Sequence, residues 1–487
     1  MNGFNVLLLN APWKTETGYG VRSNSRWAHT RKDKVLPFPV YLAYAAAVLE
    51  KNNFDVKVID AVASELSLNQ VNQAVKENEF DLIAIETTTP SIEHDLKAAE
   101  FIKSNNDIKV VLMGPHATVF DTELLEKNNF IDFVIRGEFE YTLLGLCNAL
   151  KDETPLAKVD GLTYKIKSRI IKNNSRTLAH SMDDFPFPAR HLFDMPKYET
   201  HLYKEPSFLM ISSRGCPHQC TFCLWPQTMY GHFFRARSAK NVVDEMELLV
   251  KKHNAREICF DDDTFTIGKK RVLEICDEIK RRKLNVEWSC FGRVGLDEET
   301  LRAMKSAGCE HIRYGVESGS QEVLDRCRKN VKIQQIKDTF KLTKKVGIRD
   351  YGTFMIGLPG ETWESVNKTI KLAIELDPYA VQFSMAIPFP GTEYYEEAKS
   401  NGFLLAEKWS DFDGSSRAAV RTEDLTKEDL EKAFAHAWKK FYLRPGYVFK
   451  SFFRHLSSFH DMKRLYKGTR SFFVRWAYYR NMLKAKK

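Results

Sequence analysis

Three cysteines within eight residues are the part of the chain best suited to chemistry. Cys216, Cys220 and Cys223 have the spacing CxxxCxxC. Three thiolates at this spacing on one loop can hold three irons of a [4Fe–4S] cluster, which leaves the fourth iron without a protein ligand. Such an open iron can chelate the amino and carboxylate groups of a substrate, which a cluster with four cysteine ligands cannot do.

The alternatives for these cysteines are chance clustering and a structural zinc site, with His218 or a distant cysteine as fourth ligand. Structural zinc sites usually take two Cys pairs, and the sequence has no second pair. The chain has nine cysteines, and the other six are scattered singly, at positions 147, 259, 276, 290, 309 and 327. We therefore expect reduced, mostly buried thiols and no disulfide framework.

The cysteines follow an apolar run that predicts the first strand of a second α/β region. Strand and helix patterns alternate from Phe208 to about residue 395. The predicted strands are 208–212, 257–260, 287–290, 311–316, 350–356 and 380–388. Six strands with intervening helices indicate a partial (β/α)6 barrel of the TIM type, whose chemistry lies on loops at the carboxyl ends of the strands.

The first 150 residues predict a doubly wound parallel sheet of the flavodoxin-like or Rossmann type, so the fold class is α/β. The predicted strands are 5–10, 56–60, 82–85, 110–113 and 133–135, and the clearest helices are 41–51 and 92–105. Ligands of such sheets lie beyond the carboxyl ends of the strands. The segments expected there are 11–13, 87–91, 114–117 and 136–138.

The barrel segments resemble the radical S-adenosylmethionine (SAM) superfamily. The resemblance covers about 203–400 and includes FDDDTF at 260–265, GVESGS at 315–320 and MIGLPGET at 355–362. In that family the three cysteines hold the cluster, which reduces bound SAM to a 5′-deoxyadenosyl radical. The resemblance implies that Phe222 lies by the adenine and that Arg293 meets the SAM carboxylate. The SAM-binding residues would be Phe222, Asp262, Arg293, Glu317, Ser318 and Gly357.

The residue types agree with these roles, although each motif also has a plainer interpretation. Arg293 offers a fork for a carboxylate, and Glu317 and Ser318 offer acceptors for an amino group and ribose hydroxyls. The three aspartates at 261–263 could instead form a solvated loop and helix cap, and 357–360 an ordinary turn.

The order of a doubly wound domain, a proline-rich connector and a radical SAM barrel resembles the cobalamin-binding subfamily. The resemblance implies cobalamin contacts at Thr87, Thr88, Gly114, Pro115, His116, Gly137 and Glu138. The D-x-H-x-x-G motif, whose His ligates cobalt in several relatives, is missing. We therefore expect cobalt without a His ligand, and His116 could be only a loop or helix-start residue. The alternative is a domain that keeps the fold without cobalamin.

The net charge of +9 is concentrated at the C-terminal end. Residues 439–487 contain fourteen Lys or Arg and one acid, a net charge of +13, whereas the remainder carries −4. Thirteen aromatic residues are interleaved with these cations, and helical spacing places Phe472, Phe473, Trp476 and Tyr479 on one face, flanked by Arg470, Arg475 and Arg480. Such a helix could lie on a membrane surface, pack against the barrel, or bind single-stranded nucleic acid, which we consider the least favoured of the three.

Composition excludes a polytopic membrane protein, because the mean hydropathy is −0.38 and no apolar run approaches the ~18 residues that span a bilayer. The first residues lack the pattern of a signal peptide, so we expect a cytoplasmic protein that could attach peripherally to the inner membrane face. The expected domains are 1–150 (cobalamin-binding-like), 151–202 (a connector with a small hairpin), 203–420 (radical SAM barrel) and 421–487 (basic aromatic helical extension).

We therefore expect a radical SAM enzyme with a [4Fe–4S] cluster, SAM and cobalamin that methylates an unactivated carbon of a small-molecule, hydrophobic or lipid-like substrate. A flavodoxin- or ferredoxin-type electron donor would supply the reductant. One alternative is a cyclase or carbon–carbon bond-forming enzyme of the same subfamily. Another is a nucleic-acid-associated iron–sulfur protein, such as a tRNA-modifying enzyme. No motif identifies a catalytic acid or base.

Overall fold

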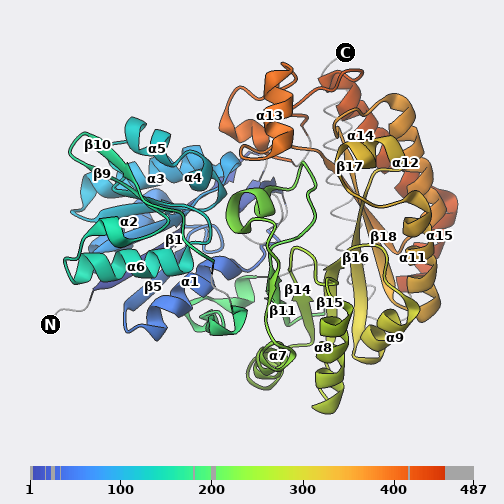
Figure 1. Ribbon diagram of the computed structural model, residues 1–487, viewed down its shortest axis with the longest axis horizontal. Coiled ribbons are helices and arrows are strands. Elements are labelled where there is room, and N and C mark those ends of the chain that lie inside the picture. Colours follow the sequence, from blue (N-terminus) through green and yellow to red (C-terminus); the bar gives the residue numbers. More distant parts are fainter. Residues whose placement is uncertain are drawn as a thin grey trace.

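The computed structural model describes residues 4–16, 18–22, 28–32, 34–178, 181–198, 204–414 and 417–455. Two sheets flanked by helices lie side by side, with the N-terminal sheet in blue and teal and the second sheet in green to orange (Figure 1). Both sheets are rich in parallel strands, which confirms the predicted α/β class.

The N-terminal sheet has seven strands in the order β10-β9-β8-β7-β6-β1-β5. Its parallel part has the flavodoxin-like order, with the first strand between the second and third. The bounds are β1 Asn5–Asn10, β5 Asp55–Asp60, β6 Leu82–Glu86, β7 Lys109–Met113, β8 Phe133–Ile135, β9 Leu162–Ile166 and β10 Arg169–Lys172. The antiparallel hairpin β9–β10 pairs with β8, so the sheet continues past residue 150 into the segment expected to be a connector.

Alternate residues of β1 enter two different cores, as a doubly wound sheet requires. Leu7 and Leu9 pack with α3 (Ile92–Asn105) on one face, in a core separate from that of Val6 and Leu8. Val6 and Leu8 share the other core with α1 (Val40–Lys51), in which ten of twelve residues are buried. This second core also contains residues of the barrel half, so the two halves are joined by a continuous apolar interface.

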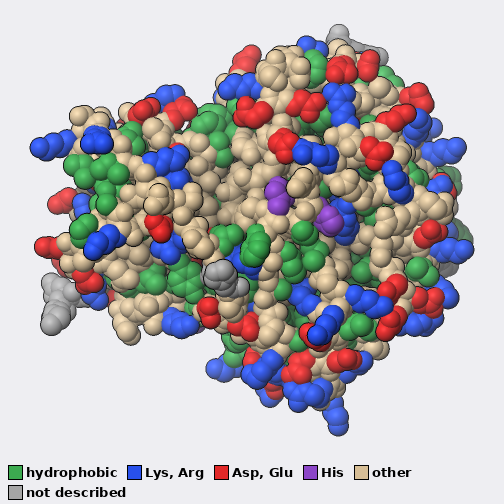
Figure 2. All heavy atoms as spheres, in the orientation of Figure 1, with side chains coloured by type: hydrophobic (Ala, Val, Ile, Leu, Met, Phe, Trp, Pro, Cys, Tyr) green, Lys and Arg blue, Asp and Glu red, His purple; other side chains and the backbone are tan. Residues whose placement is uncertain are grey.

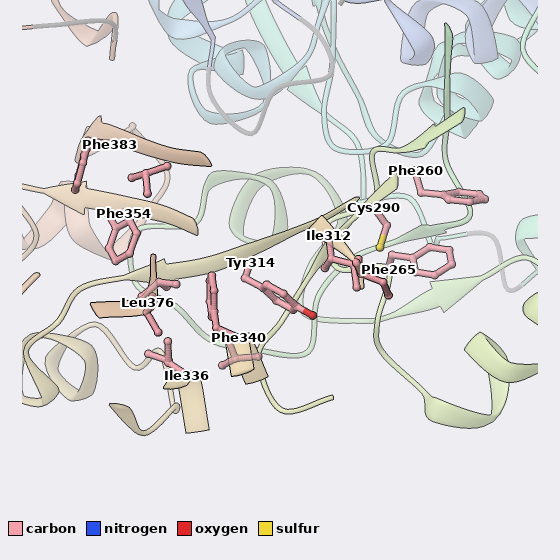
Figure 3. Packing of buried hydrophobic residues seen from close by; sticks show 14 of the residues in the cluster. Phe260, Phe265, Cys290, Ile312, Tyr314, Ile336, Phe340, Phe354, Leu376 and Phe383 are labelled. Carbon is pink, nitrogen blue, oxygen red and sulfur yellow. The ribbon is translucent and has the colours of Figure 1, made fainter. Parts of the chain in front are cut away.

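The second sheet has six parallel strands in the order β11-β14-β15-β16-β17-β18, which confirms the predicted partial barrel. The bounds are β11 Ser207–Met210, β14 Glu257–Phe260, β15 Glu287–Gly292, β16 Cys309–Glu317, β17 Arg349–Ile356 and β18 Ala380–Met385. Helices α7 (Ala239–His253), α8 (Lys269–Arg281), α9 (Glu298–Ser306), α11 (Ile333–Val346) and α12 (Trp363–Leu376) alternate with these strands. Figure 3 shows Tyr314 beside Phe340 of α11, and Phe354 and Phe383 on neighbouring strands.

The C-terminal part begins as a helical extension that packs on the barrel. Helix α14 (Lys427–Tyr442) starts with a reciprocal cap between Thr426 and Asp429, and its Phe441 is completely buried. Helix α15 (Pro445–His455) follows. The predicted amphipathic face that contains Phe472 and Trp476 lies outside the described residues. Among the described residues, no helix is both long and apolar enough to cross a bilayer.

Candidate functional site

The cysteine segment is a loop closed at its base by two short strands. Strand β12 (Ser213–Arg214) pairs antiparallel with β13 (Arg235–Ala236), so the two ends of the loop formed by residues 215–234 lie side by side. Gly215 has a φ of +82°, and a Cβ added there would lie 2.2 Å from the carbonyl oxygen of Phe233. Only glycine fits at this closure.

Two side chains inside the loop hold the cysteine backbone in place. The Nε2 amide of Gln227 donates to the carbonyls of Cys220 (3.3 Å), Thr221 (3.1 Å) and Cys223 (2.8 Å). The Nδ1 atom of His232 lies 3.3 Å from the carbonyl of Cys216 and 2.9 Å from that of His218. Sequence reasoning missed both residues, because their type and spacing match no motif.

The predicted acidic motif supports this loop from the next strand. The Asp262 carboxylate accepts hydrogen bonds from the Ser212 backbone N–H (2.7 Å) and from the hydroxyls of Ser212 and Ser213 (both 2.5 Å). Asp263 accepts from the backbone N–H of Gly215 at 2.9 Å. Asp262 is thus directed at the protein, and its predicted contact with SAM stays a prediction.

The three thiols suit an iron–sulfur cluster by donor type, number and position on one loop. Cys220 is buried, whereas Cys216 and Cys223 are partly exposed. Burial raises the pKa of the Cys216 thiol, whose Sγ lies 3.7 Å from the Thr264 hydroxyl. Among the described residues, no three Cys, His, Asp or Glu side chains converge closely enough to hold a single metal ion.

A buried ion pair lies beside Cys220. The Nζ atom of Lys329 is 2.8 Å from Oε1 of Glu317, which has a left-handed φ of +66°. Burial alone would lower the pKa of Lys329, but the charges of Glu317 and Cys220 raise it. A Cβ at Gly315 would lie 2.5 Å from Glu317 Oε1 and 2.8 Å from Lys329 Nζ, so a side chain there would displace the ion pair. Lys329 was missed, because it lies in a loop outside every motif.

One further predicted SAM contact, Arg293, lies near this pair, as does His218. Arg293 donates to the carbonyls of Lys329 and Asn330, the latter at 3.0 Å. Burial and the charges of Arg293 and Lys329 lower the pKa of His218 to about 4. One end of the cysteine loop therefore carries a group of charged or titratable side chains, those of His218, Arg293, Glu317 and Lys329.

The remaining predicted SAM contacts differ in their surroundings. Phe222 packs against the apolar cluster that contains Leu358, next to Gly357, whose φ is +97°. The Ser318 hydroxyl lies 3.2 Å from that of Thr369 and accepts from the backbone N–H of Ser320. Ser318 is thus engaged within the protein, and its ribose contact stays a prediction.

The predicted cobalamin loops meet at the carboxyl ends of β6, β7 and β8. The Thr87 hydroxyl donates to the carbonyl of Met113, and a Cβ at Gly114 (φ +107°) would lie 2.4 Å from the Thr87 carbonyl oxygen. Thr88 caps the 3-10 turn that follows. At Gly137 (φ +67°), an added Cβ would meet only the Met229 carbonyl, at 3.5 Å. The predicted cobalamin contacts of Thr87, Thr88, Gly114, Pro115 and Gly137 stay predictions.

His116 is enclosed by aromatic rings. It follows Pro115 in the short helix α4 (Pro115–Val119), and its ring lies 4.8 Å from Phe120 and 5.0 Å from Trp409. Trp409 belongs to the 3-10 helix η7 (Trp409–Phe412), so a segment after the barrel covers this edge of the N-terminal sheet. Burial lowers the pKa of His116 to about 3. His116 is therefore neutral and packed among aromatic rings, and its predicted cobalamin contact stays a prediction.

Glu138 connects the two halves. Its carboxylate lies 2.8 Å from a guanidinium nitrogen of Arg214 and 2.8 Å from one of Arg235. Arg214 also pairs with Glu140 at 2.7 Å and lies among four aromatic rings, those of Tyr41, Tyr44, Phe185 and Tyr230. Burial alone would raise the pKa of Glu138, but the two arginines hold it below its ordinary value. The predicted cobalamin contact of Glu138 stays a prediction.

The segment after the cysteines touches the N-terminal loops directly. The π-helical turn η6 (Pro226–Tyr230) packs on α4, and the Thr118 hydroxyl lies 3.8 Å from the sulfur of Met229. Figure 2 shows charged side chains spread over the outer helices, with few over the middle of this face, between the two sheets.

Comparisons with known proteins agree with this geometry. Residues 210–373 match the family model of the radical SAM superfamily, and residues 31–146 match that of the B12 binding domain. The uncharacterized methyltransferase PH0819 of Pyrococcus horikoshii is 34% identical over 86% of this chain and 90% of its own length. An anaerobic magnesium-protoporphyrin IX monomethyl ester cyclase of Rubrivivax gelatinosus is 30% identical over 74% of this chain and 66% of its own length.

Two solved structures share the fold. The methyltransferase TsrM from Kitasatospora setae, solved with cobalamin and a [4Fe–4S] cluster, has a TM-score of 0.70 at 18% identity, over 91% of this chain and 90% of its own. The cobalamin-dependent radical enzyme OxsB, solved with aqua-cobalamin and S-adenosylmethionine, has a TM-score of 0.73 at 17% identity, over 96% of this chain and 71% of its own.

Proposed function

The chain belongs to the radical SAM superfamily, in the group with an N-terminal B12 binding domain, and we propose that it methylates an unactivated carbon of a hydrophobic, lipid-like small molecule. When bound, the family's cofactors supply the chemistry: the [4Fe–4S] cluster and SAM provide a carbon-centred radical, and cobalamin provides a transferable methyl group.

One observation carries the proposal. The loop with the three cysteines and the strand-end loops predicted for cobalamin are in direct contact, through η6 and through the Arg214–Glu138 pair. A substrate bound beside this contact would reach both cofactors without leaving the protein. The apolar core shared by the two halves keeps water away from this junction.

The chain's own residues have positioning roles in this account. Gln227, His232, Asp262 and Asp263 fix the cysteine loop before any cofactor binds. Glu317 and Lys329 supply a paired acceptor and donor beside Cys220, suited to the amino and carboxylate groups of SAM. Gly315 and Gly357 have no side chain, which would let the backbone approach the nucleotide closely.

The test is anaerobic reconstitution with iron and sulfide, followed by addition of SAM and dithionite. We expect about four irons per chain and formation of 5′-deoxyadenosine. Mass spectrometry of lipid extracts from cells with and without the gene then identifies the product. A lost methyl branch supports the proposal, and a lost ring or cross-link overturns the methylation step in favour of the second candidate.

The second candidate is a cyclase of the same family. The relative from Rubrivivax gelatinosus is named a cyclase and is 30% identical to this chain, against 34% for the methyltransferase relative. A cyclase product has the mass of its substrate less hydrogen, whereas methylation adds one carbon.

The enzyme needs a reductant, and we propose a flavodoxin- or ferredoxin-type donor.

We also propose that the basic segment 439–487 attaches a cytoplasmic enzyme to an anionic membrane surface, where a lipid-like substrate is available. Sedimentation with anionic vesicles tests this attachment. The full-length chain should bind, and a variant with Arg470, Arg475 and Arg480 changed to Gln should bind less. Equal binding would dismiss the attachment.

A further inference from the structure

An exposed group of apolar side chains lies where helix α14 meets helix α15. Among the described residues, six large apolar side chains are exposed, and three of them lie within seven residues, those of Leu443, Val448 and Phe449. Their exposed fractions are 45%, 52% and 66%. We call these three residues the apolar corner. Single exposed apolar side chains are ordinary on a protein surface, whereas a group of neighbouring ones marks an interaction surface.

The backbone of the apolar corner is held against the barrel by side chains that point inward. The Tyr447 hydroxyl donates to the carbonyl of Tyr379 at 3.2 Å. The Tyr442 hydroxyl accepts from the backbone N–H of Val381 at 3.2 Å. The apolar corner is therefore a preformed surface, and a partner that binds there does not have to order it.

These anchors also place the apolar corner at one end of the barrel. Tyr379 directly precedes β18, and Val381 is its second residue, so both lie at the amino end of the strand. The cysteine loop follows β11, at the carboxyl ends of the parallel strands. The apolar corner and the cysteine loop therefore lie at opposite ends of the barrel. Figure 1 shows α15 at the right-hand edge of the barrel half, away from the N-terminal sheet.

Positive charge flanks the apolar corner. Residues 439–450 contain four Lys or Arg and no acid. Arg444 and Lys450 pair with Asp377, at 3.3 and 2.7 Å. Lys439 and Lys440 are exposed, and no acidic side chain in the described part of the chain pairs with them. Lys439 precedes Leu443 by one helical turn, which places the two on the same side of α14.

Apolar side chains beside uncompensated cations suit the interface of an anionic bilayer. There the apolar groups enter the headgroup region while the cations meet the lipid phosphates. The positive charge also continues along the chain, since residues 439–487 carry +13. A second copy of the protein would bring the same positive charge to the contact, and this repulsion opposes self-association.

We propose that the apolar corner inserts into the headgroup region of an anionic membrane, with Lys439 and Lys440 at the lipid phosphates. This inference rests on the membrane attachment proposed for residues 439–487 and deepens it. It names the apolar side chains that enter the bilayer. It also orients the enzyme, with the amino ends of the barrel strands toward the membrane and the cysteine loop at the other end.

The test measures sedimentation of the full-length reconstituted protein with vesicles of phosphatidylglycerol and phosphatidylcholine, and with vesicles of phosphatidylcholine alone. The wild type should bind the anionic vesicles more tightly. Leu443→Ser and Val448→Ser should each weaken that binding roughly tenfold, because each removes an inserted aliphatic side chain without changing the charge. The matched control is Ile166→Ser, at a side chain of β9 that is 50% exposed, and it should bind as the wild type does.

Three outcomes would overturn the inference. The first is equal binding of anionic vesicles by the wild type and both variants of the apolar corner. The second is equal binding of the wild type to the two kinds of vesicle. The third is a wild-type dimer in sedimentation velocity that Val448→Ser dissociates, because the apolar corner would then bind a second copy of the chain.

The same proteins separate this inference from the proposals on which it rests. A wild type that binds neither kind of vesicle contradicts the attachment through residues 439–487 as well. Weaker binding after the changes at Arg470, Arg475 and Arg480, together with unchanged binding of Leu443→Ser and Val448→Ser, contradicts only the insertion. Formation of 5′-deoxyadenosine, which should be equal in all these variants, tests the proposed reaction independently.

Discussion

An ion pair between Arg214 and Glu138 joins the cysteine loop to the N-terminal sheet, with Nη1 of Arg214 2.8 Å from Oε1 of Glu138. Arg214 stands two residues before the first cysteine, and Glu138 follows a predicted cobalamin-loop glycine, so the pair ties one predicted cofactor site to the other. Both side chains are almost fully buried, and their charges are compensated within a group that also contains Arg235 and Glu140.

Glu138→Gln should therefore lower the free energy of unfolding by about 3–5 kcal/mol, because it leaves two buried guanidinium groups with less compensation. Chemical denaturation with the cofactors absent measures this change. The matched control is Glu364→Gln, an exposed ion-paired residue of α12, which should change stability by less than about 0.5 kcal/mol. Equal stability of the two variants would show that the junction does not depend on this pair.

Gln227→Glu should reduce the iron content of the reconstituted protein. The substitution places a carboxylate oxygen against the three carbonyls that Gln227 now satisfies, and the repulsion displaces the Cys220–Cys223 backbone. Gln219→Glu, at an exposed position of the same loop, should keep the full iron content. Iron analysis and the visible absorbance of the cluster measure both variants. Full iron loading of Gln227→Glu would refute the positioning role.

The buried carboxyl of Glu361 should make stability depend on pH. Burial raises its pKa from 4.5 to about 7, while one oxygen accepts from the backbone N–H of Gly357. The folded protein thus keeps a proton that the unfolded chain releases. The protonated carboxyl therefore contributes a few kcal/mol to the free energy of unfolding. This contribution is fully present below pH ~4.5 and is lost as the pH rises through ~7. Glu361→Gln should therefore gain stability relative to wild type between pH 5 and 8. The free energy of unfolding of both proteins is measured by chemical denaturation at several pH values. If the difference between them did not change with pH, burial would not control the protonation of Glu361.

Bound cobalamin should lack a histidine ligand from His116. The ring of His116 is packed between Phe120 and Trp409, and ligation would have to separate these contacts. In electron paramagnetic resonance of the cobalt(II) form, wild type and His116→Phe should give the same spectrum. A nitrogen splitting present in wild type and lost in His116→Phe would show instead that the histidine moves to cobalt.

The strands of the two sheets could be predicted from sequence, because apolar runs of the right length mark buried parallel strands. All eleven strands predicted in the two sheets are present. The side-chain roles were harder, since they depend on partners distant in the chain. Glu138 meets arginines 76 and 97 residues away, and the ring of His116 is covered by Trp409. Some contacts produce no recognisable sequence spacing. Gln227 and His232 contact backbone carbonyls, and Lys329 forms a single ion pair.

The most direct test of the account measures 5′-deoxyadenosine formed from SAM by the anaerobically reconstituted, dithionite-reduced protein and by its Cys220→Ala variant. The account predicts cleavage by the wild type, with about four irons per chain, and none by the variant. Cleavage that survives the loss of Cys220, or a fully iron-loaded wild type that leaves SAM intact, would contradict it.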